Sequence, residues 1–147
     1  MPDDSALRLD NQLCFSLYSA SLAMTQLYKP HLEPLGLTYP QYLVLLILWE
    51  QDGIGLKDIG ARLRQKSGAL TPVIKRLEQD GLVRRVRLAG NERQLDIRLT
   101  ERGHALKTEA AHINRCVAEE CGMPTSDMKA LKDRLDQLRA NLQTTDS

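Results

Sequence analysis

Three cysteines, Cys14, Cys116 and Cys121, are the side chains of this sequence best suited to covalent chemistry. A thiolate attacks a peroxide and becomes a sulfenic acid, which condenses with a second thiol if one lies near. A free cysteine more commonly serves as a small hydrophobic residue, and Cys14 beside Leu13 and Leu17 fits that role equally well. The residue types alone leave Cys14 open between a reactive thiol and a packing residue.

Other chemistry has little support in the sequence. His31, His104 and His112 are scattered along it, and Cys116 and Cys121 alone make a poor zinc pair. The sequence has neither a glycine-rich phosphate loop nor a Ser-His-Asp arrangement, and a thiol peroxidase would need a reductant site of which there is no sign. We therefore expect no metal, no cofactor and no enzymatic turnover.

The charge is unevenly distributed. From Arg62 to Arg98 there are ten Lys or Arg residues and four Asp or Glu residues, a net charge of +6, whereas the whole chain carries +1. A basic segment between acidic ends is typical of a nucleic-acid-binding surface. For any single residue, such as Lys75, Arg84 or Arg87, a merely solvated charge stays an alternative.

The N-terminus and the apolar runs indicate where the protein works. Met-Pro-Asp-Asp-Ser is unlike a signal peptide, and the longest apolar run, from Tyr42 to Trp49, is too short to span a membrane. We expect a cytoplasmic protein without membrane contact. Its cysteines would rest there as thiols, and any disulfide would be transient.

Hydrophobic periodicity predicts six helices and a β-hairpin. The expected helices cover residues 7–28, 39–51, 56–63, 67–79, 100–120 and 126–142, and the expected strands cover 82–87 and 94–99. Pro30 and Pro34 should end the first helix, Ser67 should cap the fourth, and Gly122 with Pro124 should separate the last two.

Two short helices followed by a basic hairpin describe a winged helix-turn-helix, so the expected fold class is mainly α with a small β-hairpin wing (α+β). Small and hydroxyl-bearing residues at the start of the fourth helix allow close approach to bases and phosphates in the major groove. A winged protein also inserts an arginine near the hairpin tip into the minor groove. The expected DNA contacts are Lys66, Ser67, Thr71, Pro72, Lys75, Arg76, Arg87, Asn91 and Arg93.

The first helix and the last two carry apolar stripes that this module cannot cover alone. A twofold homodimer would bury the stripes and space two recognition helices about one DNA turn apart, which suits a palindromic operator in double-stranded DNA. An intramolecular helical bundle is the alternative. We expect a single domain over 1–147, with dimerisation parts at 5–35 and 101–143 and a DNA-binding part at 36–100.

Four segments occur in order: Asp-Asn-Gln-Leu-Cys-Phe at 10–15, Gly-Leu-Thr-Tyr-Pro-Gln-Tyr at 36–42, Ser-Gly-Ala-Leu-Thr-Pro at 67–72 and Asn-Glu-Arg-Gln at 91–94. Together they resemble the organic-hydroperoxide-sensing branch of the MarR regulators. The resemblance is dense over 8–104 and extends to the C-terminal helices only in pattern. It implies a dimeric repressor of a peroxide-detoxification gene, released from its operator when an organic hydroperoxide oxidises a first-helix cysteine.

The resemblance assigns roles to three residues. Cys14 occupies the position of the peroxide-reacting cysteine, and Tyr28 and Tyr39 match two tyrosines whose hydroxyls hydrogen-bond the sulfur from the other subunit. Fourteen helical residues separate Cys14 from Tyr28 by about 21 Å, so the two cannot touch within one chain. If two first helices cross antiparallel near Ser21, Cys14 falls beside the partner's Tyr28.

The resemblance also implies a resolving thiol at the end of the fifth helix. Cys121, next to a Gly-Met-Pro break, is the favoured residue, Cys116 is the alternative, and a small external thiol would serve if neither resolves. Asn91 departs from the aspartate usual in the family, so any hydrogen bond that Arg93 donates to Asn91 goes to a neutral amide oxygen instead of a charged carboxylate. Lys66, preceded by glutamine, adds positive charge beside the recognition helix.

Two other functions stay open. One is a repressor of the same family released by a small phenolic or aromatic ligand, bound between the dimerisation and DNA-binding parts. The other is a helical interaction module that does not bind DNA, against which the basic hairpin argues.

Overall fold

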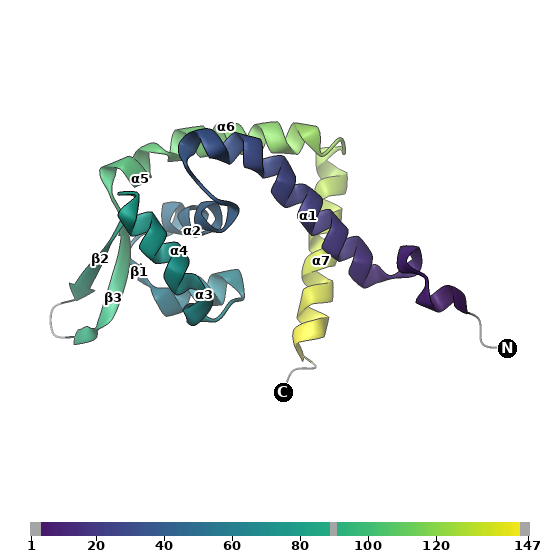
Figure 1. Ribbon diagram of the computed structural model, residues 1–147, viewed down its shortest axis with the longest axis horizontal. Coiled ribbons are helices and arrows are strands. Elements are labelled where there is room, and N and C mark those ends of the chain that lie inside the picture. Colours follow the sequence, from purple (N-terminus) through teal and green to yellow (C-terminus); the bar gives the residue numbers. More distant parts are fainter. Residues whose placement is uncertain (1–3, 89–90, 145–147) are drawn as a thin grey trace. The chain divides into compact units, whose positions relative to one another are not determined.

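The computed structural model describes residues 4–88 and 91–144, with the side chains of 88, 91–94 and 144 outside the described part. The chain forms two compact units, Met1–Ile113 and Asn114–Ser147. The helices are α1 (Leu13–Leu32), α2 (Tyr39–Glu50), α3 (Leu56–Leu63), α4 (Ser67–Gln79), α5 (Glu101–Ala105), α6 (Lys107–Glu120) and α7 (Thr125–Thr144). The strands are β1 (Ile54–Gly55), β2 (Val83–Leu88) and β3 (Asn91–Leu99), and short 3-10 turns are η1 (Asp4–Leu7), η2 (Leu9–Asn11) and η3 (Glu33–Leu35) (Figure 1). The mainly helical fold with a small antiparallel sheet is confirmed.

The first helix begins later than expected. Two 3-10 turns precede α1, so the helix starts at Leu13, and the prediction of a helix from Leu7 was wrong. The side-chain amides of Asn11 and Gln12 donate to backbone carbonyls within these turns at 2.7 and 2.6 Å. Such local bonds compete with helical ones and hold the segment in turns. Cys14 is therefore the second residue of α1.

The first helix also ends later than expected. It passes through Pro30, which we expected to end it, and continues to Leu32. Pro30 removes one helical hydrogen bond, the one to the carbonyl of Gln26, and Gln26 is exposed to solvent. Leu32 is buried and anchors the last turn, while Pro34 lies in η3.

Helix α2 begins with a capping box and then forms the centre of the core. The Thr38 side chain accepts from the backbone N–H of Gln41 at 3.4 Å, and the Gln41 side chain accepts from the N–H of Thr38 at 2.8 Å. Val44, Leu45 and Leu48 further along are 1% exposed or less. The apolar run of the sequence is thus a buried helix, as predicted.

The sheet has the order β1-β3-β2, and both pairs are antiparallel. The hairpin of β2 and β3 is confirmed, whereas β1 was not predicted because two residues offer no alternation to detect. Cross-strand partners lie on the same face of a sheet. Val83 pairs with Leu99 and Arg85 with Ile97, so these four residues share the face whose apolar members are buried.

Helices α3 and α4 occupy their predicted ranges, but Ser67 does not cap α4. The cap position is Lys66, and no side chain closes this end of the helix. The inward face of α4 carries Leu70, Ile74 and Leu77, all at most 3% exposed. Burial of this apolar face, rather than a side-chain cap, stabilises the helix.

Thr100 begins the next helix as predicted, since its hydroxyl accepts from the N–H of Gly103 at 3.1 Å. The single long helix expected here is interrupted at Leu106, which separates α5 from α6. A Cβ at position 103 would lie 2.2 Å from the carbonyl oxygen of Leu82, so only glycine fits. The carbonyl of Gly103 accepts from the indole N–H of Trp49 at 2.9 Å and joins α5 to α2.

The second unit contains the C-terminal part of α6 and the whole of α7. The predicted break between these helices is confirmed: Gly122 has a φ of 67°, and Pro124 immediately precedes α7. Lys132 donates to Asp136 one turn along α7 at 2.7 Å. No helix within residues 4–88 and 91–144 is both long and apolar enough to cross a membrane.

Candidate nucleic-acid interface and thiol site

The outward face of α4 is a strip of exposed residues suited to a DNA groove. Gly68, Pro72, Lys75, Arg76 and Gln79 recur at helical spacing and are all exposed. Lys66 and Ser67 at the start of the helix are exposed as well, and no side chain occupies the free N–H groups there. The open helix end and the cations Lys66, Lys75 and Arg76 supply the groups that bind phosphate.

Thr71 is the expected DNA contact that the structure turns inward. Its side chain is half-buried, and its hydroxyl donates to the carbonyl of Ser67 at 3.3 Å. It lines a hollow of about 60 Å³ with Ile74, Arg85 and Ile97 among others. The proposal of a base contact by Thr71 thus has less support than those for Pro72 and Lys75, and it stays a prediction.

Arg85 of the wing and Arg76 of the recognition helix have acidic partners. Arg85 of β2 donates to Glu78 of α4 at 2.9 and 3.3 Å, which ties the wing to the recognition helix. These contacts hold the pKa of Glu78 below its usual value and raise that of Arg85. The Nε of Arg76 lies 3.7 Å from a carboxylate oxygen of Asp80.

The wing presents Arg87 on the helix-facing side of the hairpin. Arg87 is opposite Leu95 in the register and shares a face with Arg85, while Arg84 and Arg98 occupy the other face. Arg87 is exposed. The backbone of Asn91 and Arg93 belongs to β3, but their side chains lie outside the described residues.

Arg64 is a cation that the expected contacts omitted. It follows α3 with a φ of 61°, in the turn that leads to α4, and its side chain is exposed. This conformation is uncommon for residues other than glycine and lets the chain reverse sharply between the two helices. The Arg-Gln-Lys run at 64–66 is the sequence signal that could have indicated it.

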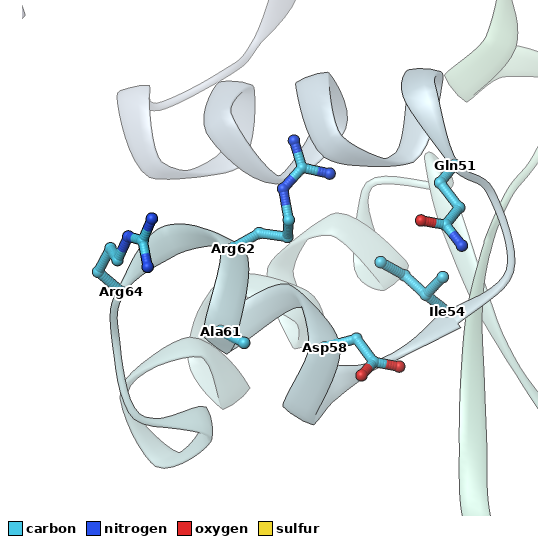
Figure 2. Close-up of a pocket in the computed structure, with 6 residues that line it drawn as sticks. All are labelled: Gln51, Ile54, Asp58, Ala61, Arg62 and Arg64. Atoms are coloured by element: carbon cyan, nitrogen blue, oxygen red, sulfur yellow. The ribbon is translucent and has the colours of Figure 1, made fainter. Parts of the chain in front are cut away.

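A hollow of about 470 Å³ lies beside α3, lined by Gln51, Ile54, Asp58, Ala61, Arg62 and Arg64 (Figure 2). In Figure 2 the Arg62 side chain points from α3 toward α2. There its Nη2 lies 2.9 Å from the carboxylate of Glu50. Asp58, Arg64 and the already paired Arg62 give the hollow mixed charge, so we assign no ligand to it. Within the part of the chain that the structure describes, no group of His, Cys, Asp and Glu could hold a metal ion.

The candidate reactive thiol, Cys14, is exposed in the first turn of α1. In the single chain, Cys14 is therefore not the buried packing residue that was the alternative. Continuous helix from Cys14 to Tyr28 keeps the two about 21 Å apart, at 1.5 Å of rise per residue. A site containing both thus needs a second chain.

Tyr28 and Tyr39 meet within one chain. Their ring centroids are 5.1 Å apart. The ring centroid of the buried Tyr42 lies 5.3 Å from that of Tyr28 and 6.4 Å from that of Tyr39. Burial raises the pKa of the Tyr39 hydroxyl, which keeps this group protonated as a hydrogen-bond donor. Two half-buried phenols thus stand together at the junction of α1 and α2.

A mostly apolar cavity of about 400 Å³ adjoins Tyr39. It is lined by residues of α1 and of the segment leading into α2: Thr25, Gln26, Lys29, Leu32, Glu33, Leu37, Thr38, Tyr39 and Pro40. Lys29 contributes a cation at its edge, 3.9 Å from Glu33. An apolar organic group with a polar end fits such a cavity.

The other two cysteines lie in the second unit. Cys116 is in α6 and Cys121 directly follows it, and both are half-buried thiols. Their burial therefore does not favour Cys121 over Cys116. Their roles as resolving thiols stay predictions.

Exposed apolar side chains gather in the two expected dimerisation parts. In the first unit they are Leu7, Leu9, Leu13, Tyr18, Leu22 and Met24, and in the second Met123, Leu131, Leu135 and Leu142. Exposed apolar side chains grouped in this way are typical of a protein interface. They support the expected homodimer, which stays a prediction.

Comparison with known proteins agrees with this geometry. Residues 37–95 match the MarR family. The organic hydroperoxide resistance transcriptional regulator of Bacillus subtilis (strain 168) is 45% identical over 136 residues, which cover 92% of each chain.

Solved structures of AbfR, a protein of Staphylococcus epidermidis, share the fold. Reduced AbfR bound to DNA is 40% identical, with a TM-score of 0.78 over 95% of this chain and 96% of that one. AbfR in its disulfide form is 38% identical, with a TM-score of 0.65 over 96% of this chain and 94% of that one. With its exposed recognition helix, its basic wing and these relatives, the chain belongs to the MarR family and is a transcriptional regulator.

Proposed function

We propose that the protein is a homodimeric repressor that binds a palindromic operator in the cytoplasm and is released when an organic hydroperoxide oxidises Cys14. The observation that carries this proposal is the exposed Cys14 on one end of α1, with Tyr28 and Tyr39 paired at the other end. In an antiparallel pair of α1 helices, the sulfur of one subunit would meet the two hydroxyls of the other. The regulated gene would encode a peroxide-detoxifying enzyme, as the name of the Bacillus subtilis relative suggests.

The chemistry is stoichiometric. The Cys14 thiolate attacks one oxygen of ROOH, the O–O bond breaks, and the alkoxide takes a proton and leaves as ROH. The sulfur is oxidised to sulfenic acid and the peroxide is reduced. A second thiol then displaces water from the sulfenic acid and forms a disulfide, so the switch is reset by an external dithiol and not by turnover.

The proposed site would couple oxidation to DNA binding through the dimer interface. Apolar side chains of α1, including Leu13 next to Cys14 and Leu22 two turns further on, are exposed in the single chain and would be buried between subunits. A polar sulfenic acid or a new disulfide there would disturb that packing. The distance between the two recognition helices would then change, and both half-sites would be lost together.

Operator binding by purified protein tests the proposal. The probe is a palindromic duplex selected by the wild-type protein from a random pool, and binding is followed by fluorescence anisotropy with and without cumene hydroperoxide. We expect hydroperoxide to release the wild type, dithiothreitol to restore binding, and Cys14→Ser to bind throughout. Release of Cys14→Ser by hydroperoxide would contradict the proposal.

The cavity beside Tyr39 supports a second candidate function, release by a small phenolic or aromatic acid. The apolar walls of the cavity would receive the aromatic ring of the ligand, and Lys29 would lie near the carboxylate of the ligand. The same anisotropy assay with salicylate separates the two. Release by salicylate in both the wild type and Cys14→Ser, with no effect of hydroperoxide, would establish the second function in place of the first.

A further inference from the structure

Gln41 is a buried polar side chain with two partners on different elements. It is 2% exposed, although it lies in the first turn of α2, two residues after Tyr39. Its Oε1 accepts from the N–H of Thr38 at 2.8 Å, which closes the capping box. Its Nε2 donates to Oδ2 of Asp80 at 3.3 Å, thirty-nine positions away in the sequence.

Asp80 stands at the end of the recognition helix. It is the C-terminal cap residue of α4, and its side chain is 32% exposed. The oxygen that accepts from Gln41, Oδ2, also lies 3.7 Å from Nε of Arg76 on the outward face of α4. The backbone carbonyl of Asp80 accepts from Arg102 of α5 at 3.0 Å, so this corner of the molecule is held from three elements.

We infer that Gln41 is a positioning residue that couples the first turn of α2 to the recognition helix through Asp80. In this way it sets both the placement of Arg76 and the response of operator binding to a change at Tyr39. The inference rests on the proposed function, because it names the internal contact by which the tyrosine site reaches the DNA-binding face.

The shared oxygen explains how such coupling works. When the Gln41 amide donates to Oδ2 of Asp80, it offsets part of the carboxylate charge that attracts Arg76. A shift of the first turn of α2 would withdraw the buried amide, and the carboxylate would hold Arg76 more strongly. Arg76 would then be less available to a DNA phosphate, and affinity would fall.

Gln41→Glu separates the two contacts of this side chain. Glutamate is an ordinary residue at this position of a capping box, so the acceptor for Thr38 is retained. The donor to Asp80 is lost, and two carboxylates then face each other. Adding Asp80→Asn restores the hydrogen bond with donor and acceptor exchanged. Gln51→Glu, at the exposed end of the same helix, is the control for an added negative charge.

The affinity of the reduced variants for the selected palindromic duplex tests the contact directly. Loss of a hydrogen bond to a charged group predicts about tenfold weaker binding by Gln41→Glu, with recovery to within about threefold in the double variant. Gln51→Glu should bind as the wild type does. Thermal melting is recorded for every variant. A merely structural role would lower the melting temperature of Gln41→Glu and leave its operator affinity, measured where the protein is fully folded, equal to that of the wild type.

The ratio of operator affinities with and without cumene hydroperoxide tests the coupling. We expect this ratio to shrink in Gln41→Glu and to recover in the double variant. A ratio equal to that of the wild type, or losses that simply add in the double variant, would overturn the inference. If hydroperoxide does not release even the wild type, the proposed function fails, and the exchange of donor and acceptor in reduced protein still decides whether Gln41 positions the recognition helix. If Gln41→Glu does not fold, Asp80→Ala removes the oxygen that Gln41 and Arg76 share. We then expect the ratio with and without hydroperoxide to shrink while the affinity of the reduced protein does not fall, and an unchanged ratio would overturn the inference.

Discussion

The rings of Tyr28 and Tyr39 lie with their centroids 5.1 Å apart, although one belongs to α1 and the other opens α2. The turn between the two helices brings them together, and Tyr42 packs against both. In the proposed site the pair would form one side, and Cys14 of a second subunit would form the other. The tyrosines are therefore the first residues on which the proposed mechanism can be tested.

Tyr28→Phe and Tyr39→Phe are expected to make the protein less sensitive to hydroperoxide. Each change removes a hydroxyl that would stabilise the thiolate while keeping the ring packing. Loss of a hydrogen bond to a charged group predicts that about tenfold more cumene hydroperoxide is needed for half-release. Operator affinity before oxidation should stay unchanged. Unaltered sensitivity in the double variant would exclude the two hydroxyls from the site.

Cys121→Ser is expected to abolish the disulfide that forms after oxidation of Cys14, while Cys116→Ser should leave it intact. Both thiols are half-buried in the second unit, so the preference rests on Cys121 standing at the break after α6. Non-reducing gels of hydroperoxide-treated protein measure the disulfide. A disulfide lost only in Cys116→Ser would reverse the assignment, and one that persists in both variants would mean that neither residue resolves Cys14.

Gly68→Ala is expected to stabilise the chain and weaken its binding to DNA. A Cβ at this position meets nothing within 4 Å, so glycine has no packing reason to be there. Alanine should raise the free energy of unfolding by about 0.5–1 kcal/mol through helix propensity. Its methyl group would stand on the outward face of α4, between recognition helix and groove. Urea denaturation and operator anisotropy measure the two effects, and Gln79→Ala at the far end of the same face is the control. Unchanged operator affinity would show that this part of the face does not contact DNA.

The ion pair between Glu78 and Arg85 is expected to make the stability of the wing depend on pH. Because Arg85 lowers the pKa of Glu78 in the folded protein, the pair contributes stability above the unfolded pKa of Glu78. That contribution is lost as pH falls through the lower folded value. Both side chains are more than a third exposed, so the difference between the wild type and Glu78→Gln should be only about 0.2–1 kcal/mol at pH 7.

Urea denaturation at several pH values measures this dependence. The difference between the wild type and Glu78→Gln should shrink as pH falls below the unfolded pKa of Glu78, and it should vanish once the carboxylate is protonated in the folded protein as well. It should also shrink in 1 M NaCl, where exposed charges are screened. A difference that persists at low pH would mean that packing and not charge accounts for the effect.

Local sequence signals predicted the elements that are stabilised locally. The start of α2 at Tyr39, the helix start at Thr100 and the break at Gly122 occur where expected. Their causes are local: a capping box, a side-chain cap and a glycine with a positive φ. Pro30 misled because a proline near the end of a helix removes a single bond, which solvent can replace, while burial of Leu32 holds the last turn. A local signal thus predicted the helix boundary correctly unless tertiary contacts outweighed it, as they do at Pro30.

The family, the winged helix-turn-helix and the candidate thiol and tyrosines could be predicted from the sequence, because these predictions depend on residue types at fixed spacing. Three contacts could be seen only in the folded chain. Thr71 turns inward, Arg85 donates hydrogen bonds to Glu78, and Gln41 donates one to Asp80. These contacts join segments far apart in the chain or depend on which helix face is buried. The physical reason is that periodicity specifies a face, whereas a partner across the core is set by how the faces pack together.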